Sequence, residues 1–259
     1  MKKEIKEKFP SWCNDTNTKY NLMLSDDLDS LFSCIVLENL FGYKIKYFYN
    51  FNMMYTTKDI EKQSSIAVDV DLTYGRCWGN HVTLDNEYSA NLNTIQGIGE
   101  YDYYYKKYFG STLLTILSYY DVDLSILTEE QKMVLLAIDS TYLGYKNPKY
   151  RHIAEYWIKD VLEFNELYEV LKRHTQEEFK DIIKKYNLDS KIIVNHDGQL
   201  NTSIKLDKLK ELFPYLPFSL PKNKFEVYRK FQVIQSNQVT HIDVFSCART
   251  YKNAFRYSI

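Results

Sequence analysis

The fold is decided by YNLMLSDDLDSLFSCIVLENLFGYKIKYFYNF, residues 20–51. Its first five residues, Tyr20–Leu24, form a short apolar run that predicts a β-strand. From Asp29 to Phe41 the apolar residues recur at helical spacing, and Gly42 follows where a helix-ending glycine belongs. Residues 44–51 then alternate polar and apolar side chains, as half-buried strands do. A strand, a helix and a second strand in this order predict two parallel strands joined by a crossover helix.

The residues that follow extend this pattern. Residues 57–63 predict a short helix capped by Thr57, and the run SIAVDV at 65–70 predicts a third buried strand. The resulting βαβαβ order predicts a parallel sheet, whose ligands bind beyond the carboxyl ends of the strands. We therefore expect an α/β fold with its functional residues at those strand ends.

The rest of the chain predicts more helices and then a mixed segment. Helices are expected at 110–120, 128–138, 153–172, 176–186 and 206–213, and strands at 192–194, 225–234 and 241–245. These patterns favour a parallel-sheet domain at 1–150, a helical connector at 151–190 and a smaller α/β domain at 191–259.

Composition excludes several classes of protein. The 259 residues are 45% hydrophobic and 26% charged with a net charge of -1, which excludes disorder as the main state and a strong positive field. The four cysteines form no CxxC pair, so a disulfide framework and a thiolate zinc site are not expected. Because the chain has neither a signal-peptide pattern nor an apolar run near the ~20 residues of a membrane span, we expect a cytoplasmic protein without a membrane partner.

Four polar clusters carry potential chemistry, and three of them follow predicted strands. SDDLD at 25–29 follows the first strand, Asp69 and Asp71 end the third, and Gly79-Asn80-His81 comes shortly after. Asp139 lies in LLAIDSTYLGY, after an apolar helical run. Each cluster also has a purely structural interpretation: a helix N-cap, an exposed strand tip, a structural histidine and a solvent-facing helical aspartate.

Taken together, the clusters offer mainly carboxylate oxygens with one imidazole. That combination suits Mn²⁺ or Mg²⁺ better than a thiolate-bound metal. Two such ions about 3.5–4 Å apart could clamp a phosphate and activate a water. The candidate metal ligands are Asp27, Asp29, Asp69, Asp71, His81 and Asp139.

The order of these motifs resembles the DHH superfamily of phosphoesterases. The segment SDDLDSLFS at 25–33 is similar to its first motif, (H/D)-x-D-x-D-G-x-x-S, and Asp69 matches the second, with Asp71 as the alternative. Gly79-Asn80-His81 takes the place of the eponymous Asp-His-His, and Asp139 that of the fourth motif. The resemblance covers residues 20–145.

The resemblance implies a hydrolase that uses two Mn²⁺ or Mg²⁺ ions on phosphodiester bonds of nucleotide substrates. It implies that Asp69 bridges the ions, and that Asn80 and His81 act in catalysis. It also implies that basic residues near the end of the chain hold substrate phosphates: Arg249, Lys252 and Arg256. The near-neutral charge favours short oligonucleotides, single strands or cyclic dinucleotides over long duplexes.

Departures from the family pattern keep other interpretations open. Ser25 replaces a His or Asp ligand, Asn80 replaces a histidine, and no GGGH motif follows. A catalytically degraded relative that binds a nucleotide or a protein is one alternative. A calcineurin-like metallophosphoesterase is another, although only its GNH is present.

The oligomeric state is not fixed by the sequence, and a homodimer is one of the states allowed. Tyrosine is abundant, with 24 residues, which fits codon bias, although tyrosine-rich surfaces can also stack bases.

Overall fold

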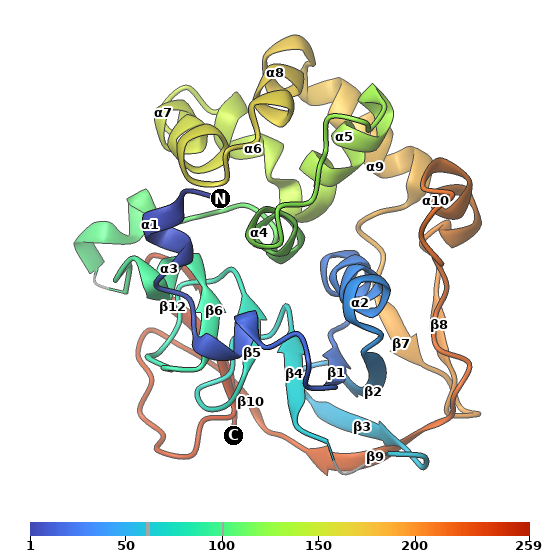
Figure 1. Cartoon of the computed structure of the whole chain (residues 1–259). Helices are drawn as coiled ribbons and strands as arrows, with labels where there is room; N and C mark the ends of the chain where they lie inside the picture. Colours follow the sequence, from blue (N-terminus) through green and yellow to red (C-terminus); the bar gives the residue numbers. More distant parts are fainter. Residues whose placement is uncertain (61–62, 100) are drawn as a thin grey trace.

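A central seven-stranded sheet organises the protein (Figure 1). The structure is a computed structural model that describes residues 1–60, 63–99 and 101–259. The strand order is β6-β5-β4-β1-β2-β3-β9, with the first five parallel and the last two antiparallel to their neighbours. The strands are β1 Asn21–Leu24, β2 Lys44–Tyr49, β3 Met53–Thr57, β4 Ser65–Val68, β5 Cys77–Gly79, β6 Ser89–Asn91 and β9 Phe225–Lys230.

The first crossover follows the sequence prediction closely. Helix α2, Leu28–Phe41, connects the parallel strands β1 and β2. The side chain of Asp27 caps its start by accepting a hydrogen bond from the Ser30 amide, which would otherwise lack a partner. Gly42 ends the helix at φ 70°, a left-handed conformation that glycine adopts without steric cost. The predicted mixed α/β fold with a mostly parallel sheet is confirmed at this level.

Each face of the sheet packs against a different layer. Leu22 and Leu24 of β1 join the large core under the helices, whereas Met23 faces a smaller cluster with Phe231 on the opposite side. This alternation follows from the two-residue period of a strand. The helices on the larger side gather at the top of Figure 1. They include α4 Thr112–Tyr119, α5 Glu129–Ala137, α6 Tyr142–Lys146, α7 Arg151–Glu155, α8 Asn165–Arg173 and α9 Gln176–Tyr186.

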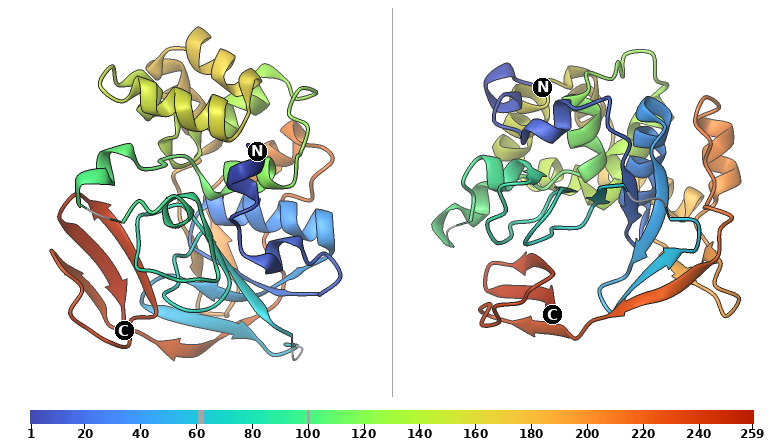
Figure 2. Two further views of the ribbon diagram at one scale, coloured as in Figure 1. Left: turned by 60° about the vertical axis from the view of Figure 1, so that its left-hand side comes forward. Right: turned by 60° about the horizontal axis from the view of Figure 1, so that its bottom comes forward.

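A strand from the last part of the chain joins the sheet formed by the first part. Strand β9 pairs with β3 in the main sheet, and the three strands after it form a separate small sheet, red in Figure 2. That sheet has the order β10-β12-β11, with β10 Val233–Ser236, β11 Ser246–Tyr251 and β12 Ala254–Ser258. A two-stranded pair and one helix precede it: β7 Ile192–Val194, β8 Leu200–Thr202 and α10 Leu206–Leu212. The division of the chain at 150 and 190 stays a prediction.

Short elements complete the fold. They are α1 Lys3–Lys6, α3 Leu92–Ile95, the 3₁₀ turns Ser11–Asn14, Tyr101–Lys106 and Ile138–Ser140, and a π-helical turn at Tyr156–Val161. None of the helices within the described ranges is long and apolar enough to cross a membrane.

Four predicted elements differ in the structure. The helix expected at 57–63 is wrong at its start, because Thr57 is the last residue of β3. The β-branched and aromatic residues of β3 favour a strand, and this strand pairs with β2. Residues 61 and 62 lie outside the described ranges. The helix expected at 153–172 is interrupted by the π-helical turn and by Glu163 at φ 60°. The strand expected at 225–234 is two strands, since Phe231 leaves the main sheet. The strand expected at 241–245 is absent, and pairing begins only at Ser246.

Candidate metal site

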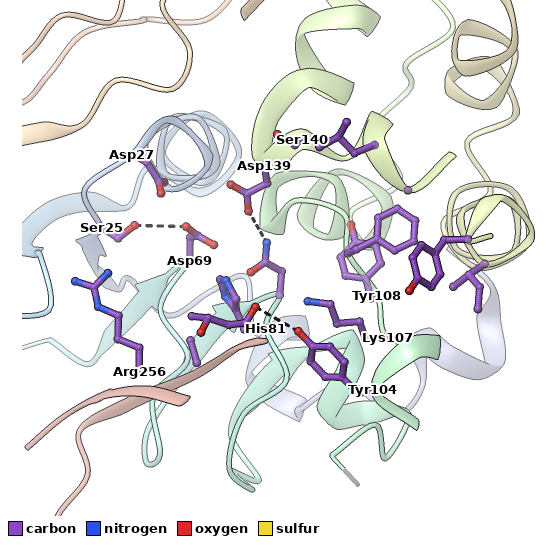
Figure 3. Close-up of a pocket in the computed structure, with 18 of the residues that line it drawn as sticks. Ser25, Asp27, Asp69, His81, Tyr104, Lys107, Tyr108, Asp139, Ser140 and Arg256 are labelled. Carbon is purple, nitrogen blue, oxygen red and sulfur yellow. Dashed lines mark hydrogen bonds between the residues drawn. The ribbon is translucent and has the colours of Figure 1, made fainter. Parts of the chain in front are cut away.

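Three aspartates that are far apart in sequence meet beyond the carboxyl ends of β1 and β4. Asp29 lies in the first turn of α2, Asp69 follows β4, and Asp139 lies in the turn after α5. One carboxylate oxygen from each lies within 4.8 Å of the others. Figure 3 shows the side chains of Asp69 and Asp139 close to each other. This triad of Asp29, Asp69 and Asp139 could hold a metal ion.

Unusual backbone conformations place two of the triad. Asp69 has φ 57° and Asp139 has φ 52°, both in the left-handed region. Aspartate tolerates this region better than most residues, but it is still uncommon outside glycine. Backbone strain of this kind clusters at functional sites, where the surrounding structure fixes it.

The start of α4 donates hydrogen bonds to two of the three carboxylates, those of Asp29 and Asp69. Asp29 is buried, and its two carboxylate oxygens accept hydrogen bonds from the amides of Thr112 at 2.7 Å and Leu113 at 2.8 Å. The Thr112 hydroxyl donates to Asp69 at 2.8 Å. The Ser25 hydroxyl donates to the other Asp69 oxygen over a longer 3.5 Å. The amino end of a helix favours negative charge, so α4 stabilises both carboxylates without supplying a full positive charge.

Asn80 adds an oxygen that lacks a partner. Its amide nitrogen donates to the Asp139 carboxylate at 2.7 Å and to the Gly110 carbonyl at 3.2 Å, and these two acceptors fix which way the amide points. The side-chain carbonyl oxygen of Asn80, Oδ1, is buried and has no hydrogen-bond partner among the described residues. A buried polar atom without a partner calls for a water or an ion.

Asp71 orients His81 and lies outside the triad. His81 Nδ1 lies 3.1 Å from one Asp71 oxygen, and Asn91 donates to the other at 2.6 Å. Gly79 makes room for this carboxylate, because a Cβ there would lie 2.0 Å from Asp71 Oδ1. Burial lowers the pKa of the His81 imidazole, but the hydrogen bond and charge of Asp71 raise the pKa overall. The structure pairs Asp71 with His81 and Asn91, and its predicted role as a metal ligand stays a prediction.

Lys191 forms ion pairs with two aspartates outside the triad, Asp26 and Asp27. Its ammonium lies 2.9 Å from Asp26 and 3.1 Å from Asp27. The other oxygen of Asp27 caps α2 through Ser30. Asp27 lines the pocket beside the triad, and its negative charge is already neutralised by the ammonium of Lys191.

The predicted phosphate-binding residues lie near one another on β11, β12 and their turn, but their side chains have different surroundings. The Lys252 ammonium lies 5.0 Å from the ring centroid of Tyr105. Arg256 lines the pocket, and its guanidinium stacks over Phe51 at 4.4 Å from the ring centroid. Arg249 is buried and donates to the backbone carbonyls of Gly99 and Lys252. Among the described residues that line this pocket, only Arg256 comes from the predicted trio.

The triad concentrates negative charge in a poorly solvated place. Burial, followed by the neighbouring carboxylates, raises the pKa of Asp29 and of Asp69 well above the usual range. The Asp139 pKa is also raised, by enclosure at the pocket wall and then by the charge of Asp27. A bound cation would reverse these shifts by stabilising the charged forms.

Asp69 and Asp139 of the triad line a pocket of about 680 Å³, and Asp29 lines a smaller pocket beside Asp139. That volume lies within the range of small-molecule sites. No family model, curated protein or solved structure matches this chain. What the pocket does must therefore be argued from its own residues.

Sequence reasoning missed three residues of this site. Thr112 could have been found, because Ser111 and Thr112 precede an apolar helical run in the manner of a cap. Lys107 follows several tyrosines and lines the pocket, but nothing in its neighbourhood indicates this. Lys191 reaches Asp27 from 164 residues away, a pairing that no local pattern predicts.

Proposed function

We propose that this protein is a divalent-metal-dependent phosphoesterase that hydrolyses phosphodiester bonds of nucleotide substrates. One observation carries the proposal: Asp69 and Asp139 line one pocket together with Asn80, whose side-chain carbonyl oxygen has no partner among the described residues, and the buried Asp29 completes their carboxylate cluster. The similarity of the motifs to the DHH superfamily supports the same chemistry.

The residues present fit a hard cation. Asp29, Asp69, Asp139 and Asn80 offer four oxygens, and Mn²⁺ and Mg²⁺ prefer oxygen ligands. When bound, such an ion neutralises phosphate charge and activates a water for attack on phosphorus. Asp27 is the residue closest to providing a second ion site, if Lys191 releases it.

The side chains around the triad have complementary tasks. Arg256 and Lys107 bring positive charge to the pocket, where they would hold the non-reacting oxygens of the phosphate. His81 also lines the pocket, and Asp71 fixes the orientation of its ring. With a raised pKa, the imidazole holds a proton at Nε2 that it can give to the leaving oxygen.

A second candidate is a protein that binds a nucleotide without cleaving it. The ion pair between Lys191 and Asp27 favours this alternative, because the protein's own ammonium already neutralises that carboxylate. Replacement of a family histidine by Asn80 points the same way.

Hydrolysis of short RNAs, single-stranded DNAs and cyclic dinucleotides separates the two candidates. The assay measures mononucleotide release with Mn²⁺, with chelator, and with Asp69→Asn; Asp160→Asn is the matched control, since Asp160 is exposed and far from the triad in sequence. Metal-dependent release that is lost in Asp69→Asn and kept in Asp160→Asn supports the phosphoesterase. Binding without release in all conditions supports the second candidate.

A further inference from the structure

The wall of the pocket away from the triad is aromatic and apolar. It is built from the short helices after residue 100 and after α5, and includes Tyr104, Tyr105, Phe109, Leu143, Tyr150 and Ile153. Phe109 is fixed there because it packs on Gly144, where a Cβ would lie 2.1 Å from the ring. The phosphoesterase chemistry proposed above makes no use of these residues, so the wall calls for its own ligand.

Two tyrosines on this wall lie parallel to each other. The rings of Tyr105 and Tyr150 are inclined by only 9°, and their centroids are 6.4 Å apart. Centroid distances of about 4.5–7 Å are usual for offset-stacked aromatic rings, so the pair forms a parallel aromatic platform on which a flat base can stack. Tyr105 is also 45% exposed, which leaves ring surface available to a ligand.

We infer that Tyr105 and Tyr150 stack a nucleobase of the substrate while its phosphate reaches the triad. Planar bases of every kind have a π face, so stacking of this type requires no particular base. This inference rests on the proposed function, and it identifies the aromatic wall as the part of the pocket that selects a base over a plain phosphate ester.

A lysine completes the stacking site. The Lys149 ammonium lies 5.4 Å from the centroid of Tyr105 and 5.4 Å from that of Tyr150. Being equally far from both rings, it can donate a hydrogen bond to a ring nitrogen or carbonyl of a base held by the pair. Lys107 lies on the same pocket wall, with its ammonium 5.0 Å from the ring of Tyr104, where it can meet the phosphate.

Equilibrium binding in chelator tests the stacking site without any need for turnover. Calorimetric titrations compare AMP with ribose 5-phosphate, which carries the same phosphate and sugar but no base. They are made on the unsubstituted protein, Tyr105→Ala, Tyr150→Ala and the ring-preserving Tyr105→Phe. Tyr215→Ala is the matched control, because Tyr215 is 90% exposed and lies outside the pocket lining.

We expect AMP to bind at least about 10-fold more tightly than ribose 5-phosphate. Each alanine variant should weaken AMP binding by about 5- to 100-fold, the usual effect of removing a stacking ring. Ribose 5-phosphate binding should not change, and Tyr105→Phe and Tyr215→Ala should behave as the unsubstituted protein. A dinucleotide that binds more tightly than AMP would assign the site to an oligonucleotide end, and equal binding would assign it to a mononucleotide unit.

Equal affinity for AMP and ribose 5-phosphate would overturn the inference, as would alanine variants that bind AMP normally. Either result would leave the proposed phosphoesterase intact, provided that metal-dependent hydrolysis is observed. Conversely, strong base-dependent binding with no hydrolysis would keep the stacking site and reject the phosphoesterase. Near-ultraviolet circular dichroism of each variant separates loss of the rings from loss of the fold.

Discussion

Replacing Asp139 by asparagine should make the protein more stable when no metal is present. Asp139 is the suitable member of the triad for this test. Asp29 accepts two backbone amides and Asp69 accepts two hydroxyls, so changing either would disturb those donors. Asp139 accepts the Asn80 amide, a bond that an asparagine carbonyl oxygen can also accept. Asp139→Asn therefore removes charge with little loss of hydrogen bonding.

The magnitude follows from the carboxylate separation. Two unit charges 4.8 Å apart repel by about 3 kcal/mol at an effective dielectric constant of about 20, and by about 1 kcal/mol in water. Asp139 opens onto the pocket, so water screens part of this repulsion. We expect Asp139→Asn to raise the free energy of unfolding by about 1–2 kcal/mol in chelator at pH 8.

The gain should depend on pH in a defined direction. The pKa of Asp139 is raised in the folded state, so the folded protein holds a proton that the unfolded chain has already released. The unsubstituted protein therefore loses stability as pH rises from about 4, the unfolded pKa, through the folded pKa. The difference between Asp139→Asn and the unsubstituted protein should be near zero at pH 4 and largest at pH 8.

Added Mn²⁺ should cancel most of the stability gain of Asp139→Asn. An ion at 100 times its dissociation constant stabilises a protein by about 2.7 kcal/mol, and a tenfold weaker site gains about 1.4 kcal/mol less. Urea unfolding followed by circular dichroism, with chelator and with Mn²⁺, measures both effects, and Asp160→Asn is the control. If Asp139→Asn is less stable in chelator and gains as much from Mn²⁺, the assignment of the triad as a cation site is refuted.

Three further predictions test the surroundings of the triad. Gly79→Ala should cost about 1–3 kcal/mol of stability in urea unfolding, because its Cβ would lie 2.0 Å from Asp71 Oδ1; an unchanged midpoint would contradict this packing. Asp71→Asn should lower the pKa of His81, measured by NMR titration of the imidazole, since the hydrogen bond and charge of Asp71 raise that pKa; no downward shift would reject the pairing. Lys191→Met should change stability by less than about 1 kcal/mol yet tighten Mn²⁺ binding if Asp27 is a ligand, and unchanged calorimetric affinity would leave Asp27 outside the metal site.

The elements predicted correctly from the sequence are those whose limits depend on neighbouring residues. The crossover from β1 through α2 to β2 carries its own signals in strand alternation, the Asp27 cap and Gly42, and all three appear in the structure. Helix α9 has its predicted limits, 176–186, and in the structure Thr175 and Glu178 form a capping box at its start.

The failures occurred where distant contacts decide the structure. Thr57 belongs to a strand because it pairs with Phe225 of β9, which comes from the far end of the chain. Phe231 ends β9 because its ring leaves the main sheet to pack on Tyr49, a contact across 182 residues that no window of sequence contains.

In the candidate site, too, neighbouring residues indicate some features and contacts between distant segments determine the others. That Asp69 and Asp139 are unusual could be suspected from their positions after apolar runs, but their left-handed conformations and their meeting within 4.8 Å come from the assembled fold. The roles of Asp71 and Asp27 were the hardest to predict. They depend on which partner reaches each carboxylate, His81 in one case and Lys191 in the other.

The distribution of partners among the acidic residues separates the triad from its neighbours. Outside it, Asp26 and Asp27 share the ammonium of Lys191, and Asp71 has the imidazole of His81.

Inside the triad the partners are backbone amides, hydroxyls and one carboxamide, which orient a carboxylate without cancelling its charge. Among the described residues, no lysine or arginine forms an ion pair with Asp29, Asp69 or Asp139. Asp29 is buried, and carboxylates this close together are costly unless they are protonated or neutralised. Within the described residues, the chain thus supplies cations to the outer carboxylates and none to these three, which leaves a carboxylate cluster that could hold a metal ion.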